Sequence, residues 1–459
     1  MSYNKISNTA FSLTAGRAIA TTFDGIVYID AHNYFPERVR AFSSLTEVSD
    51  VAPTDSRMYI AAQQVFGADI SPKELKIGRR TADTEITPTG VADAQVYNVT
   101  ITVNDGDFVV ASYTAGVSDD EEAVVDGLLA DITGDVDVAA HVTAAKVGTG
   151  SSAVLTISAT TATDEFSISS LSKNIDVDFI NDTETAADVL QAIIDEDDEF
   201  YFVTAYDKTE AFVLGMDVAA TAQGKMYKVS LPDQNILTTL VDPAVDTMGK
   251  LKETGNQYTF SEFHQDAATD FVELRSLVPF ALSKGGDYSV AVNYVNGVPA
   301  SADPSTGKRL SGAQEGYIES RNGNYYDYSK TGVLYNGSVG KVASGDWVED
   351  VRNRDILEAT INNNLTAFRL AAPIVPYTQA GVEQYLNVIR TTLDRFVSTD
   401  DTPNILAPDV PYIIPDIDVA DIPLVDKQNR VLEIEVTLYL AGVIQTVEVT
   451  GTLTFNQDV

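Results

Sequence analysis

Cysteine is absent from this sequence, so disulfide bonds, thiolate metal sites and a cysteine nucleophile are excluded. Histidine is almost as scarce, because His32, His141 and His264 are the only three and fall in three different segments. A metal site or a general base built on a histidine pair would require long-range folding. A lone histidine, buried or exposed, is the favoured interpretation of each, and we expect neither a cofactor nor a metal ion.

Basic residues are few: 30 lysines and arginines stand against 67 aspartates and glutamates, which gives a net charge of −37. Direct binding to nucleic acid is not expected, because that affinity depends on basic side chains that neutralise phosphates. Such acidity is typical of a self-repelling soluble monomer, of a salt-adapted protein, or of a subunit whose acidic faces meet basic faces in an assembly.

Long apolar runs are also missing. No stretch approaches the about 18 apolar residues of a membrane-spanning helix, and the opening residues do not resemble a signal peptide. Membrane insertion is therefore not expected. The 44% of hydrophobic residues suffice to bury a core, and a length of 459 residues predicts two to four domains.

The stretch from Phe35 to Arg80 predicts the first packing unit of the fold. Two strands flank its central part, GIVYIDA (25–31) and KELKIGR (73–79). Strand, helix and strand in this order form a βαβ-like unit. The first strand is not followed by a glycine fingerprint, so the unit does not predict a nucleotide site.

A helix is predicted between these two strands. Ser44 precedes Glu47 by three residues, which is the spacing of a capping box, and Thr54 offers a second cap. The apolar residues that follow recur at the spacing of one buried helical face: Met58, Ala61, Ala62, Val65 and Phe66.

From about Val91 to residue 180 the chain becomes rich in short predicted strands. These are residues 96–103, 107–114, 152–160 and 165–169. One helix is predicted among them, over 118–132 with Ser118 as its cap. Fifteen acidic residues stand against two lysines here, which indicates a small solvated module inserted between the halves of one domain.

An alternation of helices and strands follows the module. Helices are predicted over 183–194, 208–221 and 266–284, and strands over 199–207 and 225–231. Two longer helices, Ser344–Ala371 and Thr378–Ser398, precede a proline-rich stretch. The sequence then ends on a hairpin pattern, with predicted strands over Val431–Leu440 and Val443–Phe455.

These elements predict a multidomain α/β (α+β) fold with layered sheets and helices. The predicted parts are an extended N-terminal arm (1–20), a discontinuous α/β core (21–90 and 181–335), a β-rich insertion (91–180), and a C-terminal α+β domain (336–459) that ends in the hairpin.

Motifs of catalysis are missing: the sequence contains no GxSxG, GxxxxGK[ST] or HExxH. The acidic clusters at 119–122 and 195–199 fit solvated helix ends better than calcium ligation, and Asp131, Asp135 and Asp137 do not follow the EF-hand register. Three tyrosines could form a sugar-stacking patch or serve in packing: Tyr325, Tyr326 and Tyr328. A carbohydrate-binding or adhesion protein and a hydrolase with paired carboxylates therefore stay open as alternatives.

Four segments resemble the contractile tail-sheath proteins of myophages, which are related to the sheaths of contractile injection systems. The first two are FPERVRAFSSLTEV (35–48) and RMYIAAQQVFGADISPKELKIGRR (57–80). GDWVEDVRNRDILEATINNNL (345–365) resembles the aspartate- and tryptophan-bearing helix of the sheath C-terminal domain. VPYTQAGVEQYLNVI (375–389) resembles its proline, tyrosine and threonine segment.

The resemblance implies a structural subunit and not an enzyme. Such subunits stack as hexameric rings around a tail tube, and their contraction drives the tube through the host envelope. The implied partners are further copies of the chain, the tube protein, and the baseplate and tail terminator proteins. The implied location is the contractile tail of a virion that is assembled in the cytoplasm of a bacterial host.

In that family, terminal arms of neighbouring subunits complete a β-sheet in the C-terminal domain. The resemblance therefore implies assembly contacts at both ends of this chain. The apolar residues that we expect to make them are Phe11, Leu13, Ile19, Val431, Ile434, Val436, Leu438, Val443, Val447 and Leu453.

Overall fold

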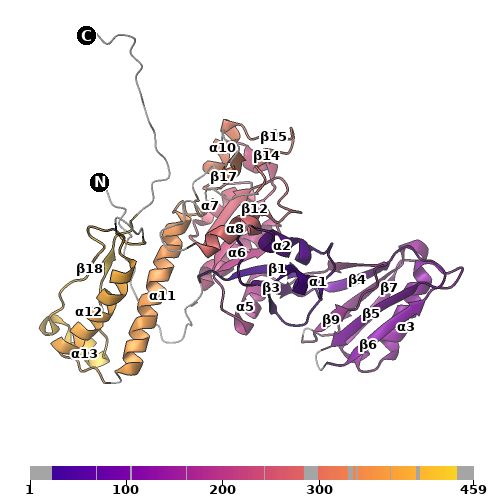
Figure 1. Ribbon diagram of the computed structural model, residues 1–459, viewed down its shortest axis with the longest axis horizontal. Coiled ribbons are helices and arrows are strands. Elements are labelled where there is room, and N and C mark those ends of the chain that lie inside the picture. Colours follow the sequence, from indigo (N-terminus) through magenta and orange to yellow (C-terminus); the bar gives the residue numbers. More distant parts are fainter. Residues whose placement is uncertain are drawn as a thin grey trace, which may run out of the picture.

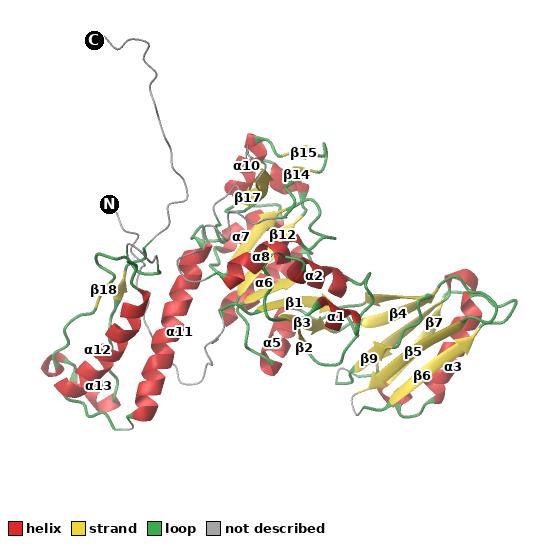
Figure 2. Ribbon diagram, in the orientation of Figure 1, coloured by secondary structure: helices red, strands yellow, loops and turns green. Residues whose placement is uncertain are grey.

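The fold is a multidomain combination of helices with several separate sheets (Figures 1 and 2). The computed structural model describes residues 23–441 except 69, 104–105, 162, 242, 284–297, 329–333, 337–339, 373 and 400–403. Within these residues the predicted α/β class is confirmed.

A six-stranded sheet forms the centre, in the order β13-β12-β11-β1-β3-β2. Its strands are β1 (Ile26–Ala31), β2 (Val39–Phe42), β3 (Leu75–Arg80), β11 (Phe202–Ala205), β12 (Met226–Leu231) and β13 (Thr259–Phe263). All neighbours pair in parallel except β2, which runs antiparallel to β3. The five parallel strands are buried along their whole length, as expected for a sheet that is covered on both faces.

Helices cover the two faces of this sheet and create two cores. Ile26 and Tyr28 of β1 point to one core, with α2 (Arg57–Phe66) and α8 (Val272–Leu282). Val27 and Ile29 point to the other, with α5 (Ala186–Glu196) and α6 (Glu210–Gln223). Two shorter helices, α1 (Leu45–Ser49) and α7 (Thr247–Thr254), complete the layers.

The predicted helix caps are partly wrong. Ser44 caps α1, but Glu47 bonds Ser43 instead of completing a box with Ser44. Ser56 rather than Thr54 caps α2, because its hydroxyl accepts a hydrogen bond from the Tyr59 amide. Likewise, Asp120 and not Ser118 caps α3 (Glu121–Gly134). For α2 and α3, the helix begins two residues later than the predicted cap implies, so the polar residue at the observed start accepts the bond from the first turn.

A β-rich module extends from one side of the six-stranded sheet (Figure 1). One of its sheets has the order β10-β4-β8-β7 and the other has the order β6-β5-β9. The strands are β4 (Asp83–Pro88), β5 (Val96–Val103), β6 (Phe108–Thr114), β7 (Val142–Val147), β8 (Val154–Ala159), β9 (Phe166–Ser169) and β10 (Ile175–Ile180). The helix α3 and a short turn of helix, α4 (Val138–His141), accompany them. The predicted strands β5, β6, β8 and β9 are confirmed, and the other three were not predicted.

Small elements follow β13 along the chain. They are β14 (Ala302–Asp303), β15 (Lys308–Arg309), α10 (Gly312–Glu319), β16 (Tyr326–Tyr328) and β17 (Leu334–Asn336). Tyr325 and Tyr326 are buried, so they do not form the surface patch that a sugar would need. Of the two alternatives for these two tyrosines, packing is the one that the structure supports.

A 24-residue helix, α11 (Val348–Ala371), runs from the core to the C-terminal part. Val348 and Val351 in its first turns belong to the core beside α8. Leu357 and Ile361 belong to a separate C-terminal core with α12 (Gln379–Leu393). The remaining elements of this part are α13 (Leu424–Asn429), β18 (Tyr412–Ile413) and β19 (Thr437–Leu438).

Candidate assembly site

Several charged side chains inside the core are paired with opposite charges. Lys228 and Glu262, each 1% exposed, lie 3.1 Å apart, and burial lowers the pKa of Lys228. Arg321 binds Asp246 at 2.9 Å, and both are buried. Because removal of either partner would strand a buried charge, these pairs stabilise the fold and are not poised for chemistry.

The three histidines lie apart. His32 and His264 are buried, and His141 contacts Asp164 at 2.8 Å within the β-rich module. Across the part of the chain that the structure describes, no group of three or more histidine, aspartate or glutamate side chains is placed to hold a metal ion. None of the described helices is both long enough and apolar enough to span a bilayer.

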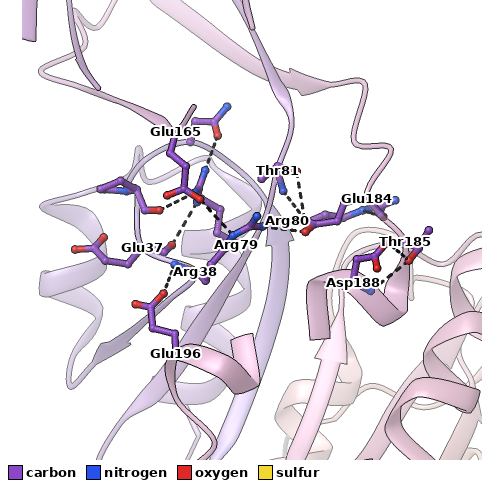
Figure 3. A network of polar contacts seen from close by, with 12 residues as sticks. Glu37, Arg38, Arg79, Arg80, Thr81, Glu165, Glu184, Thr185, Asp188 and Glu196 are labelled. Carbon is purple, nitrogen blue, oxygen red and sulfur yellow. Dashed lines mark hydrogen bonds and ion pairs between the residues drawn. The ribbon is translucent and has the colours of Figure 1, made fainter. Parts of the chain in front are cut away.

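Arginines at the end of β3 join the six-stranded sheet to the β-rich module (Figure 3). Arg79 binds Glu165, which precedes β9, at 3.0 Å and donates a hydrogen bond to the Pro36 carbonyl. Arg80 binds Asp182, which follows β10, at 3.1 Å and Asp207 at 2.8 Å. The chain that enters the module and the chain that leaves it are therefore held at one point of the sheet.

The acidic run at 195–199 also has partners. Asp197 accepts a hydrogen bond from Lys76 at 2.5 Å, and Asp198 contacts Lys225 at 2.6 Å. Lys76 lies in β3, Lys225 immediately precedes β12, and both are buried. Sequence reasoning left the acids of this run as solvated or useful elsewhere, and the structure shows that Asp197 and Asp198 neutralise buried lysines.

The C-terminal core is closed by a small sheet around β19. Tyr439 donates its N–H to the Pro411 carbonyl at 2.9 Å and accepts the Ala407 N–H at 2.8 Å. Ala441 donates to the Ile405 carbonyl at 2.9 Å. All three bonds join one side of this strand to the 405–413 segment, which includes β18.

Within the residues that the structure describes, the opposite side of this strand has no partner strand, and we call it the open edge. Peptide groups alternate in direction along a strand, so those of Leu438 and Leu440 point away from the 405–413 segment. Among the described residues, no hydrogen bond reaches these groups. A strand with one free edge can accept a further extended segment through main-chain hydrogen bonds.

The predicted assembly residues divide into three groups. Val436 and Leu438 are each 7% exposed and fill the C-terminal core of their own subunit, and Ile434 packs against it. Val431 is exposed, and its carbonyl accepts a hydrogen bond from the Tyr377 hydroxyl. Six others lie outside the described residues: Phe11, Leu13, Ile19, Val443, Val447 and Leu453.

The predicted terminal strand Val431–Leu440 is corrected by the structure. Residues 431–436 do not form a strand, and pairing begins at Thr437. Thr437 and Leu438 pair with β18, a strand that was not predicted. The other predicted strand of the hairpin, Val443–Phe455, lies outside the described residues.

Asp350, in the first turn of α11, gives the chain a pH-dependent stability. Burial, together with the nearby Asp346 carboxylate, raises the pKa of Asp350 to about 6. The folded state therefore binds the proton more tightly than the unfolded state, and stability is lost as pH rises from about 4 to about 6. We expect Asp350→Asn to raise the free energy of unfolding by about 2 kcal/mol at pH 8 and to have no effect at pH 3.5. Denaturant titrations at both pH values test this, and an equal effect at both would contradict it.

No family model and no curated protein matches the sequence. Among solved structures, the fold is similar to that of a chain in the cryo-EM structure of the anti-feeding prophage (AFP) baseplate, 6-fold symmetrised. The alignment covers 99% of this chain and 98% of that chain, with a TM-score of 0.53 and 12% sequence identity. The likeness thus concerns the overall fold and extends over nearly the whole of both chains.

Proposed function

We propose that this chain is a structural subunit of a contractile phage tail sheath, or of the related sheath of a contractile injection system. Its subunits stack as rings around a tail tube and slide during contraction, which drives the tube through the host envelope. The observation that carries the proposal is the fold likeness to a chain of the six-fold symmetrised prophage baseplate over nearly all of both chains. That symmetry favours hexameric rings.

The open edge of β19 supplies the contact that such an assembly needs. The predicted N-terminal arm of one subunit adds as a strand beside Leu438 and Leu440 of the next subunit. Main-chain hydrogen bonds of this kind hold two subunits together while their rigid parts rotate. The separate C-terminal core supports this role, because the small sheet of β18 and β19 packs on it independently of the central sheet.

The division into an arm (1–20), a core (21–90 and 181–335), an insertion (91–180) and a C-terminal domain (336–459) belongs to the same proposal. The subunit has no enzymatic role. Its partners are further copies of itself, the tube protein, and the baseplate and terminator proteins, within a tail assembled in the bacterial cytoplasm. The paired charges of the core support a mechanical role, since they leave buried acids and bases committed to one another.

Electron microscopy of the purified chain tests this function. At high protein concentration and moderate salt, which screens the charge of −37, we expect rings or hollow tubes. Sedimentation of the same samples measures the polymerised fraction. A species that stays strictly monomeric at every concentration, and also when mixed with a purified tube protein, would refute the proposal.

A further inference from the structure

Arg352, in the second turn of α11, lies where three segments of the chain meet. Its guanidinium is buried and donates to the carbonyls of Phe280 at 2.6 Å and Ala281 at 2.9 Å. These carbonyls belong to the last turn of α8, where the helix dipole favours a cation, and the Phe280 carbonyl also accepts hydrogen bonds from Ser283. A third bond, 2.7 Å long, reaches the carbonyl of Phe23.

Phe23 is the first residue that the structure describes. Its ring is also connected to α11, through the side chain of Tyr201. The ring centroid lies 5.1 Å from that of Tyr201, whose hydroxyl donates to Asp355 at 2.7 Å. Asp355 stands three residues after Arg352 on the same helix. Both the carbonyl and the side chain of Phe23 are thus connected to one face of α11.

The next fixed point along the chain is Gly25. Its carbonyl accepts hydrogen bonds from the Tyr201 and Phe202 amides at 3.1 and 3.0 Å, which begins the pairing of β1 with β11. The contact with Arg352 therefore fixes the chain two residues before the sheet does.

We propose that Arg352 is a positioning residue that anchors the N-terminal arm to α11, so that a pull on the arm is delivered directly to this helix. The inference rests on the proposed function, in which the arm joins neighbouring subunits. Because α11 continues into the C-terminal core, the anchor links the arm of a subunit to the sheet that receives the arm of another.

The chemistry of this anchor requires arginine. A guanidinium presents five N–H donors in a planar fork, which lets one side chain bond carbonyls from two segments at once. The guanidinium carbon atom (Cζ) of Arg352 also lies 5.2 Å from the ring centroids of both Phe202 and Phe280. A lysine at this position keeps the charge but cannot hold both the end of α8 and Phe23 in the same geometry.

The absence of cysteine permits a direct test with a single label. Asp24 is exposed, so the variant Asp24→Cys can carry a nitroxide spin label. The mobility of this label shows whether the neighbouring Phe23 is held by Arg352. With Arg352→Lys we expect the spectrum of a mobile nitroxide. We also expect the critical concentration for polymerisation to rise about tenfold, which corresponds to the loss of one charge-assisted hydrogen bond. Arg369→Lys is the matched control, because Arg369 is exposed in the last turn of the same helix, fourteen residues beyond Asp355. It should leave both values unchanged.

A label that stays immobile in Arg352→Lys would overturn the proposal, as would equal effects of the two lysine variants. If Arg352→Lys fails to fold, Arg352→Gln takes its place, since its short amide keeps N–H donors for the end of α8 but lacks the second arm of the guanidinium that reaches the Phe23 carbonyl. The label must again become mobile. Should the parent chain form no polymers, the proposed function fails, but label mobility still decides whether Arg352 anchors residue 24.

Discussion

Deletion of residues 1–20 is expected to leave a folded subunit that no longer polymerises. Among the residues that the structure describes, buried side chains from Ile26 onward form the core clusters, and we expect these clusters to persist without the arm. Without the arm, no neighbouring subunit can add a strand to the open edge at Leu438 and Leu440. Circular dichroism and thermal unfolding should match those of the full chain, whereas sedimentation should show monomers at concentrations where the full chain forms polymers.

A full-length variant separates the length of the arm from its chemistry. Replacing Phe11, Leu13 and Ile19 by serine keeps every main-chain donor but removes the apolar side chains. If these side chains fill pockets on the neighbouring subunit, the triple variant should also fail to polymerise. Truncated protein that still forms polymers as the full chain does would show that the arm is dispensable.

Arg321→Met is expected to destabilise the core more than any surface change. Three N–H···O contacts of 2.9–3.0 Å join Arg321 to Asp246, and further bonds reach the carbonyls of Asn235, Thr238 and Tyr317. Loss of the guanidinium strands a buried carboxylate, which costs about 3–5 kcal/mol. Chemical denaturation, monitored at the transition of the core, measures this loss.

Two further variants give this result its meaning. Lys250→Met removes a solvent-exposed pair with Glu210 and should cost no more than about 1 kcal/mol. Adding Asp246→Asn to Arg321→Met removes the stranded charge and should restore part of the stability. Similar losses for Arg321→Met and Lys250→Met would show that the buried pair is not the main support of this region.

The central sheet was largely predictable because its strands are buried on both faces. β1 and β11 appear in the sequence as nearly continuous apolar runs, whereas β3 and β12 combine apolar residues with basic residues that buried or half-buried acids neutralise. In contrast, β4 and β10 expose one face to solvent and carry acidic residues there, as in the sequence IDVDFI of β10. Such strands have a weak signature, since their partners rather than their own composition define them.

The assembly site was predictable only in part. The alternation around Val436 and Leu438 identified side chains that the C-terminal core does bury. The open edge was not visible, because it depends on which peptide groups the 405–413 segment leaves unbonded. The role of Arg352 had no sequence signal either, since its carbonyl partner in Phe23 lies 329 residues away.

The continuity of α11 makes it a lever between the two parts of the subunit. At 1.5 Å per residue, its 24 residues span about 36 Å. If the core turns by about 10° around the root of this helix, the far end moves by about 6 Å, which is close to the 5.4 Å pitch of a helix. A small tilt at the root is thereby converted into a displacement of about one helical turn at the tip, enough for a neighbouring helix to exchange one set of side-chain contacts for the next.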